Sequence, residues 1–196
     1  MTKAERTRQF IIEQTAPLFN SKGFTGTSLT DLTEKTKLTK GALYGNFENK
    51  EEIAQEAFQY AMHKVRQCVQ AKLSEATTYK GQLLKLLEFY SAYVFDPPVP
   101  GGCPLLNSAV ETDDMETGLR PVVVREIVQT VDFIENLLKK GIRAGEFRRG
   151  TNIRELAYTF FCVIEGAVMF SRVERSREPM DIIVKHCKKL LDQISK

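Results

Sequence analysis

The chain has 196 residues, of which 42% are hydrophobic and 27% charged, a balance typical of a globular protein rather than a disordered one. Residues 1–50 contain eight lysines and arginines against five acidic residues, whereas the other 146 residues contain 20 of each sign, so the formal charge of +3 lies in the first quarter. A basic segment joined to a neutral body predicts a part that binds a polyanion and a part that does something else.

Several classes of protein are disfavoured. The longest apolar run, residues 156–170, is interrupted by Glu165 and is too short to span a bilayer, so no membrane partner is expected. From the polar N-terminus we expect no secretory signal, and the four cysteines form no CxxC pair, which favours a cytoplasmic location. Motifs of hydrolases and nucleotide-binding enzymes are missing. His186 and Cys187 are adjacent on a predicted helix, so their side chains point in different directions and cannot bind one metal ion. We therefore expect no catalytic residues, no metal site and no cofactor.

The spacing of apolar residues predicts an all-α chain of about nine helices, because strand-like alternation is missing. The first helix is expected at residues 4–21, ended by Gly23 in the left-handed conformation. Pro17 falls inside it and predicts a kink, since proline removes one backbone hydrogen bond.

Three helices follow in the basic segment. They are expected at residues 29–36, 40–47 and 49–74. Ser28 is the expected N-cap of the first, with Asp31 completing a capping box, and Thr39 caps the second. The third starts at Asn49, with Glu52 as its capping partner.

The remaining helices are expected at residues 81–95, 104–117, 121–143, 153–172 and 179–194. Four of the seven prolines lie within residues 97–104, which excludes a helix there. Pro104 opens the next helix, which places Cys103 at its N-cap, and Pro179 opens the last.

Residues 27–47 form two short helices separated by a tight turn. Their apolar residues can build a small core that holds the helices at a steep angle: Leu29, Leu32, Leu38, Leu43 and Phe47. The second helix is small and polar on its outer side. This is the pattern of a helix-turn-helix, whose second helix can enter a major groove of DNA.

Residues 25–53, TGTSLTDLTEKTKLTKGALYGNFENKEEI, are similar to the DNA-binding domain of the TetR family of bacterial transcriptional regulators. The upstream FNSKGF of residues 19–24 adds to the match, which covers about residues 6–55. The rest of the chain resembles the family only in architecture: length, all-helical pattern and two apolar C-terminal helices.

The resemblance implies a three-helix DNA-binding domain at residues 1–50 and a helical ligand-binding and dimerisation domain at residues 51–196. It implies a homodimer that binds a palindromic operator in double-stranded DNA as a repressor and leaves it when a small-molecule effector binds. By position, the expected DNA-binding residues are Ser28, Thr39, Lys40, Gly41, Tyr44, Asn46 and Lys50.

Alternatives remain open for some of these residues. Tyr44 could cap the small core, and Lys40 and Lys50 could be solvated surface lysines. Arg6 and Arg8 could belong to a flexible tail or could reach a phosphate. The family often has His or Tyr where Asn46 stands, so a DNA contact there can differ.

The helix at residues 153–172 is apolar around most of its circumference, which predicts cover by a partner subunit. The expected dimer interface, shared with the last helix, contains Phe160, Ile164, Val168, Ile183, Cys187 and Leu190. An effector pocket is expected among the fourth to eighth helices. Its candidate residues are Phe89, Tyr93, Phe95, Cys103, Met115, Phe133, Leu137, Phe161 and Glu165.

Two further features of the body allow more than one interpretation. Glu111 and Glu165 are expected at helix edges, solvated or paired, and either would suit a cationic ligand if it pointed inward. Cys103 at a helix N-terminus could be a thiol that senses electrophiles, as in a few members of the family, or a small buried residue that completes a loop. A DNA-binding protein controlled by a protein partner is the remaining alternative.

Overall fold

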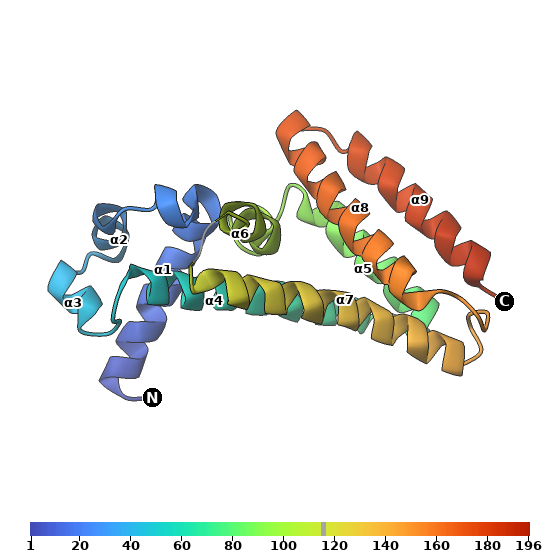
Figure 1. The fold of residues 1–196 in the computed structure, drawn as a ribbon, viewed down its shortest axis with the longest axis horizontal. Helices are drawn as coiled ribbons and strands as arrows, with labels where there is room; N and C mark the ends of the chain where they lie inside the picture. Colours follow the sequence, from blue (N-terminus) through green and yellow to red (C-terminus); the bar gives the residue numbers. More distant parts are fainter. Residues whose placement is uncertain (115–116) are drawn as a thin grey trace. The chain divides into compact units, whose positions relative to one another are not determined.

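The computed structural model describes residues 1–114 and 117–196, which form nine α-helices (Figure 1). Their bounds are α1 Lys3–Gly26, α2 Leu29–Thr36, α3 Lys40–Tyr44, α4 Lys50–Leu73, α5 Tyr79–Tyr93, α6 Pro104–Thr112, α7 Leu119–Arg143, α8 Ile153–Glu174 and α9 Glu178–Ile194. The described residues contain no β-strand, only an isolated bridge between Phe147 and Ser195. The all-α prediction is confirmed.

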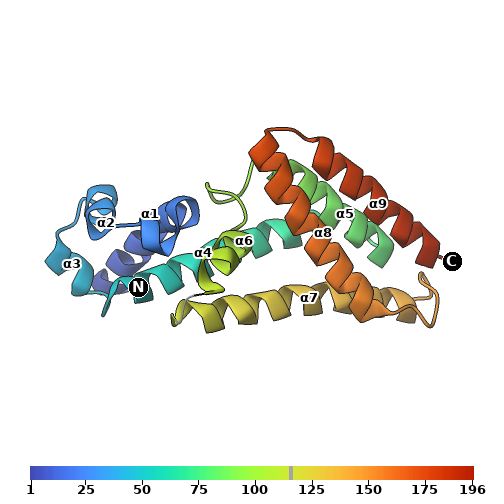
Figure 2. The same ribbon diagram turned by 45° about the horizontal axis from the view of Figure 1, so that its top comes forward.

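The chain divides into two compact units. The first combines residues 1–65 with residues 98–125, and the second combines residues 66–97 with residues 126–196. In the second unit α8 packs against α9, and both contact α5 (Figure 2). In the first unit α1 contacts both α2 and α6, so α1 lies between α6 and the helix-turn-helix segment in these contacts.

The caps predicted for the short helices are present. The hydroxyl of Ser28 accepts a hydrogen bond from the Asp31 amide and the carboxylate of Asp31 accepts one from the Ser28 amide, which completes the capping box of α2. The hydroxyl of Thr39 accepts from the amide of Ala42 in α3. Local side-chain chemistry therefore sets both helix starts.

The start of α4 differs from the prediction in one contact. The Asn49 side chain accepts a 2.8 Å hydrogen bond from the amide of Glu52, as an N-cap does. The Glu52 carboxylate, however, accepts from the amide of Glu48 rather than from Asn49. Glu52 therefore binds the backbone one residue before the expected position, and its other carboxylate oxygen binds Arg8.

The end of α1 also differs from the prediction. Gly23 has a positive φ of 74°, but its ψ of 174° is extended rather than left-handed, and a further turn continues to Gly26. Pro17 lies inside α1, and the non-helical dihedral angles of this helix occur at Gly23 instead. Glu111 of α6 lies against Gly23, where its carboxylate oxygens are 2.8 Å from the position that a Cβ would occupy.

Other helix bounds differ from the prediction by two to five residues. α3 ends at Tyr44 rather than at residue 47, and α6 ends at Thr112 rather than at residue 117. α5 begins at Tyr79, because the Thr78 hydroxyl caps it through the amide of Gly81. Met115, expected in the effector pocket, lies outside the described residues.

The core of the first unit joins α1 to the helix-turn-helix. Leu43 and Phe47 are buried as predicted, and Leu29 and Leu38 are partly buried against the same cluster. The buried members of the cluster are Ile11, Ile12, Ala16, Phe19, Leu32, Leu43, Phe47, Ile53, Ala54 and Ala57. Since α1 and α4 both contribute, the two short helices are held on a two-helix platform.

α8 is longer than the apolar run in the sequence. Its 22 residues include an 18-residue window with a mean hydropathy of 1.5, enough by length and composition to cross a membrane. Residues 156–170 were expected to be too short to span a bilayer, but the helix that contains them is long enough. A helix that buries one face in its own chain is equally typical of the core of a soluble protein, and α8 buries Ala157, Phe160, Ile164 and Val168.

Candidate nucleic-acid interface

The helix α3 has one apolar and one polar face. Leu43 is fully buried, whereas Thr39, Lys40, Gly41 and Tyr44 are exposed. Because α3 has a single turn and a half, its orientation depends on the packing of Leu43 and the turns at each end. Four of the predicted DNA-binding residues therefore lie together on the free surface of this helix.

Tyr44 does not cap the small core. Its side chain is 38% exposed, and the ammonium of Lys40 lies 6.0 Å from the centre of its ring. A phenol ring and a lysine at a helix surface can contact phosphate and sugar groups of DNA. The exposed fraction favours the surface interpretation of Tyr44 over the core one.

Ser28 is engaged by its own helix. Its hydroxyl accepts from the Asp31 amide at 3.1 Å and donates to the Asp31 carboxylate at 2.6 Å. The Lys22 ammonium, followed by the Ser28 hydroxyl, holds the pKa of Asp31 well below its usual range. Ser28 is exposed, so its contribution at the interface includes fixing the start of α2.

Asn46 and Lys50 lie at the turn between α3 and α4. The side-chain amide of Asn46 donates a 2.8 Å hydrogen bond to the carbonyl of Ala42, which ties the turn to α3. Lys50 is the first residue of α4, and its ammonium lies 4.3 Å from the centre of the Phe24 ring. Both predicted residues thus border α3, and each already has a partner within the first unit.

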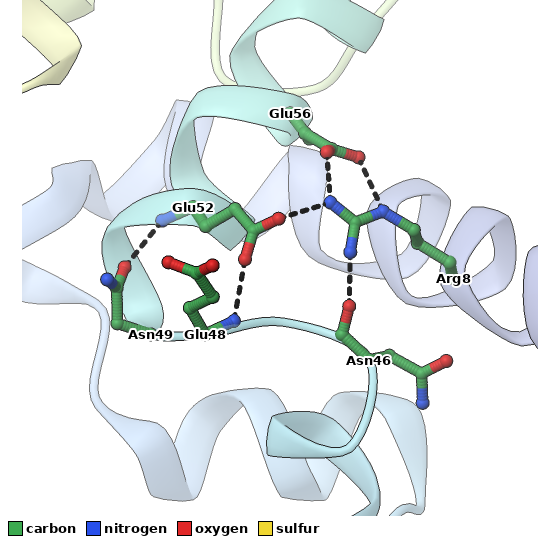
Figure 3. A network of polar contacts seen from close by, with 6 residues as sticks. All are labelled: Arg8, Asn46, Glu48, Asn49, Glu52 and Glu56. Carbon is green, nitrogen blue, oxygen red and sulfur yellow. Dashed lines mark hydrogen bonds and ion pairs between the residues drawn. The ribbon is translucent and has the colours of Figure 1, made fainter.

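Arg8 belongs neither to a flexible tail nor to a free basic surface. It lies in α1, where its guanidinium binds the carboxylates of Glu52 and Glu56 and the carbonyl of Asn46 (Figure 3). The hydrogen bond from Arg8, followed by that from the Glu48 amide, lowers the pKa of Glu52. No local pattern in the sequence indicates this network, because it joins Arg8 to residues 46–56, which lie far away in the sequence. Arg6 also lies in α1, so the tail interpretation is wrong for both arginines.

Seven of the pocket candidates lie in the second unit. Tyr93, Leu137 and Glu165 are buried, and Phe89, Phe133 and Phe161 are half-buried. Phe89, Tyr90 and Tyr93 form a cluster with ring centres 5.2–5.6 Å apart. Phe95 is half exposed, with the Arg177 guanidinium 5.9 Å from its ring.

Cys103 lies in the first unit, in residues 98–125, and its side chain is 6% exposed. It is the N-cap of α6, as predicted, and its sulfur accepts from the Leu106 amide at 3.5 Å. Glu111 is paired, as expected of an acid at a helix edge, because it accepts from the amides of Phe24 and Thr25. Glu165, by contrast, is buried.

A cavity in the first unit lies among α1, α4 and α6. Its volume is about 20 Å³, room for one water molecule rather than for an organic effector. Of the residues that line it, Glu111 is the one for which the sequence suggested a role in ligand binding. No group of three or more potential metal ligands occurs among the residues that the structure describes.

Most of the expected dimer residues are covered by the chain itself. Phe160, Ile164, Val168 and Cys187 are at most 3% exposed, so the expectation that a partner subunit covers them was wrong, and Ile183 and Leu190 are half-buried. The apolar residues of these two helices that are exposed lie outside the expected interface set: Tyr158, Met169, Phe170, Val173 and Ile182. Their helical spacing was visible, but the sequence could not show which face of α8 turns outward.

Comparisons with known proteins agree with this architecture. Residues 11–57 match the model of bacterial regulatory proteins of the tetR family, and residues 80–187 match the tetracyclin repressor-like C-terminal domain. The chain therefore belongs to the TetR family of transcriptional regulators.

Individual relatives extend over nearly the whole chain. A TetR-family transcriptional regulator from Cytophaga hutchinsonii is 43% identical, with a TM-score of 0.93 over 100% of this chain and 98% of that one. The HTH-type transcriptional repressor DhaR of Mycobacterium sp. (strain GP1) is 25% identical over 174 residues, 89% of this chain and 86% of the repressor. CifR, solved as a cysteine mutant with a 26-bp double-strand operator DNA, shares the fold at 21% identity, with a TM-score of 0.82 over 92% and 94% of the two chains.

Proposed function

We propose that this protein is a cytoplasmic, ligand-responsive repressor that binds a palindromic operator as a homodimer and is released by a small molecule. The observation that carries the proposal is the face of α3, where Thr39, Lys40, Gly41 and Tyr44 are exposed above the buried Leu43. The solved complex of CifR with operator DNA supports a DNA-binding role for this fold.

In the proposed complex α3 enters a major groove and its exposed residues contact base edges and phosphates. Gly41 allows close approach of the backbone to DNA, because the space around its Cβ position is nearly open. Lys50 and Asn46 border the groove, and Ser28 lies at the start of α2 beside the backbone. Domain 1–50 then supplies the DNA contacts.

A homodimer is proposed through α8 and α9 of domain 51–196. Met169, Phe170 and Val173 of α8 and Ile182 of α9 are between 42% and 79% exposed in one chain. Exposed apolar surface of this kind marks interaction sites. Two copies would place two α3 helices on one face of the DNA, about 34–36 Å apart or a multiple of that distance.

The effector is proposed to bind in the second unit, near the cluster of Phe89, Tyr90 and Tyr93. Phe133, Leu137, Phe161 and Glu165 remain candidates for its lining. An aromatic cluster with a carboxylate suits an aromatic or cationic molecule. A coupling free energy of about 1–3 kcal/mol would change operator affinity about 5- to 150-fold.

A thiol-sensing regulator is the second candidate. It is favoured by Cys103, which caps α6 and so places its sulfur at a helix N-terminus, where thiolate is stabilised. The burial of this side chain opposes it. If N-ethylmaleimide releases DNA from the wild type but not from Cys103→Ser, the thiol candidate is supported; equal release from both proteins rejects it.

The proposed function is tested by selecting bound duplexes from a random DNA pool with the purified chain at moderate salt. A matched protein with Lys40→Ala and Tyr44→Ala serves as the control, because both side chains are exposed and neither belongs to the core. Enrichment of a palindrome by the wild type alone supports the proposal. Failure of a folded wild type to enrich any sequence would overturn it.

A further inference from the structure

We propose that Arg8 is a positioning residue for operator recognition: its guanidinium fixes the turn after α3 against α1 and α4, and it makes no DNA contact itself. The proposal rests on the proposed DNA-binding function. It concerns a residue outside the exposed face of α3.

The guanidinium joins three parts of the first unit (Figure 3). Its Nε donates to Glu56 at 3.2 Å, one Nη binds Glu52 and Glu56 together, and the other Nη donates to the backbone carbonyl of Asn46. Its carbon lies 4.1 Å from the centre of the Phe47 ring. One side chain of α1 therefore holds two carboxylates of α4, and one carbonyl and one ring of the turn.

The turn between α3 and α4 is fixed on both sides by these contacts. Arg8 holds the Asn46 carbonyl, while the side chain of the same residue donates to the Ala42 carbonyl inside α3. Glu52 accepts from the Glu48 amide and from Arg8 at once. Because α3 has only five residues, its direction depends on this turn more than on its own hydrogen bonds.

Arginine is suited to this role because its planar fork donates in several fixed directions. All three nitrogens of Arg8 already donate to protein oxygens, and the side chain is only 32% exposed. These bonds use four of the five N–H groups of the guanidinium, and the two carboxylates beside it leave the cluster with a net negative charge, which disfavours a phosphate contact. Arg8 therefore differs from Lys40 and Lys50 in its hydrogen bonds to the protein, although all three residues are basic.

Positioning and phosphate contact predict different effects of Arg8→Gln. Loss of a positioning residue weakens binding to the selected operator but not to unrelated DNA, because nonspecific binding comes from phosphate contacts elsewhere. The slope of log affinity against log salt then stays unchanged. Removal of a phosphate-binding residue instead lowers both affinities and reduces that slope by about 0.9 for each phosphate that is no longer neutralised.

The experiment measures affinity for the selected operator and for a shuffled duplex of equal length at several salt concentrations. The proteins are the wild type, Arg8→Gln, Arg8→Lys, Glu56→Gln, and the double variant Arg8→Gln/Glu56→Gln. Arg6→Gln is the matched control, since Arg6 is an exposed arginine on the same helix. Thermal unfolding of each variant confirms that it is folded at the assay temperature.

We expect Arg8→Gln to lose about tenfold in the ratio of operator to shuffled affinity, in line with loss of hydrogen bonds to charged groups. Arg8→Lys should recover part of that ratio, and the double variant should be no worse than Arg8→Gln, because the two residues act through one contact. Arg6→Gln should keep the ratio. An unchanged ratio in folded Arg8→Gln, or a reduced salt slope, would overturn the inference while leaving the proposed function intact. A wild type that does not discriminate between the duplexes would overturn both.

Discussion

The carboxylate of Glu111, on α6, accepts a 2.6 Å hydrogen bond from the backbone amide of Phe24, in the last turn of α1. Its other oxygen accepts from the amide of Thr25 at 2.7 Å. These two amides follow the break at Gly23 and lead into α2. A side chain of α6 therefore caps the segment that connects α1 to the helix-turn-helix.

Replacing Glu111 should destabilise the first unit. We expect Glu111→Ala to lower the free energy of unfolding by about 1–3 kcal/mol, because two amides lose a charged acceptor. The change is measured by urea unfolding, with circular dichroism as the signal. Val110→Ala, at an exposed neighbour on α6, is the control and should have little effect. Equal midpoints for wild type and Glu111→Ala would show that the cap contributes nothing.

Gly141 should not tolerate a side chain, although it lies inside α7. Alanine usually stabilises a helix relative to glycine by about 1 kcal/mol. Here a Cβ would lie against the ring of Phe147, so we expect Gly141→Ala to lower the melting temperature. In a Phe147→Ala background the same substitution should cost less, because only the tight contact with the Cβ of Tyr79, at 3.3 Å, remains. A higher melting temperature for Gly141→Ala alone would contradict the packing described.

Cys187 should be unreactive in the folded protein. Burial raises the pKa of its thiol to about 12, compared with 9.0 for the free group, so almost no thiolate forms at pH 8. Because the folded-state pKa is raised, this effect leaves stability unchanged below pH 9 and reduces it as the pH rises from 9 towards 12. Mass spectrometry after brief iodoacetamide treatment should find label on the exposed Cys68 and Cys162 first. Labelling of Cys187 at the same rate would refute the prediction.

A charge in the exposed apolar surface of α8 should separate the proposed dimer. Phe170 is 54% exposed in one chain, so Phe170→Glu should leave the fold intact while preventing a second copy from covering it. Light scattering at micromolar concentration should report a dimer for the wild type and a monomer for the variant. Val110→Glu, in an exposed apolar position on α6, should leave the mass unchanged. A dimer that survives Phe170→Glu would place the interface elsewhere.

Local signals in the sequence were sufficient for the helices of the DNA-binding segment. Ser28 with Asp31, and Thr39, are caps that act within three residues, so their pattern could be recognised without tertiary information. Leu43 and Phe47 were predictable as core residues because the residues around them in the sequence are mostly small or polar, which leaves these two as the apolar side of the segment. The exposed face of α3 followed from the same pattern.

Contacts between distant segments could not be predicted. Arg8 meets Glu52 and Glu56 across more than forty residues, and a basic residue near an N-terminus gives no sign of such partners. The apolar residues of α8 point in most directions, so their number alone could not distinguish the face covered by the chain from the face left for a partner. Only the packing against α5 and α9 resolves that choice.

The central claim, that the exposed face of α3 reads operator sequence, is tested most directly by the affinity of the wild type and Tyr44→Ala for the selected operator and its shuffled counterpart. Tyr44 lies outside the core, so the variant should keep the wild-type melting temperature. We predict that Tyr44→Ala binds the operator about tenfold more weakly, as expected when an interaction of about 1–3 kcal/mol is removed from a protein–DNA interface. Equal operator affinity for the wild type, Tyr44→Ala and Lys40→Ala would contradict the account.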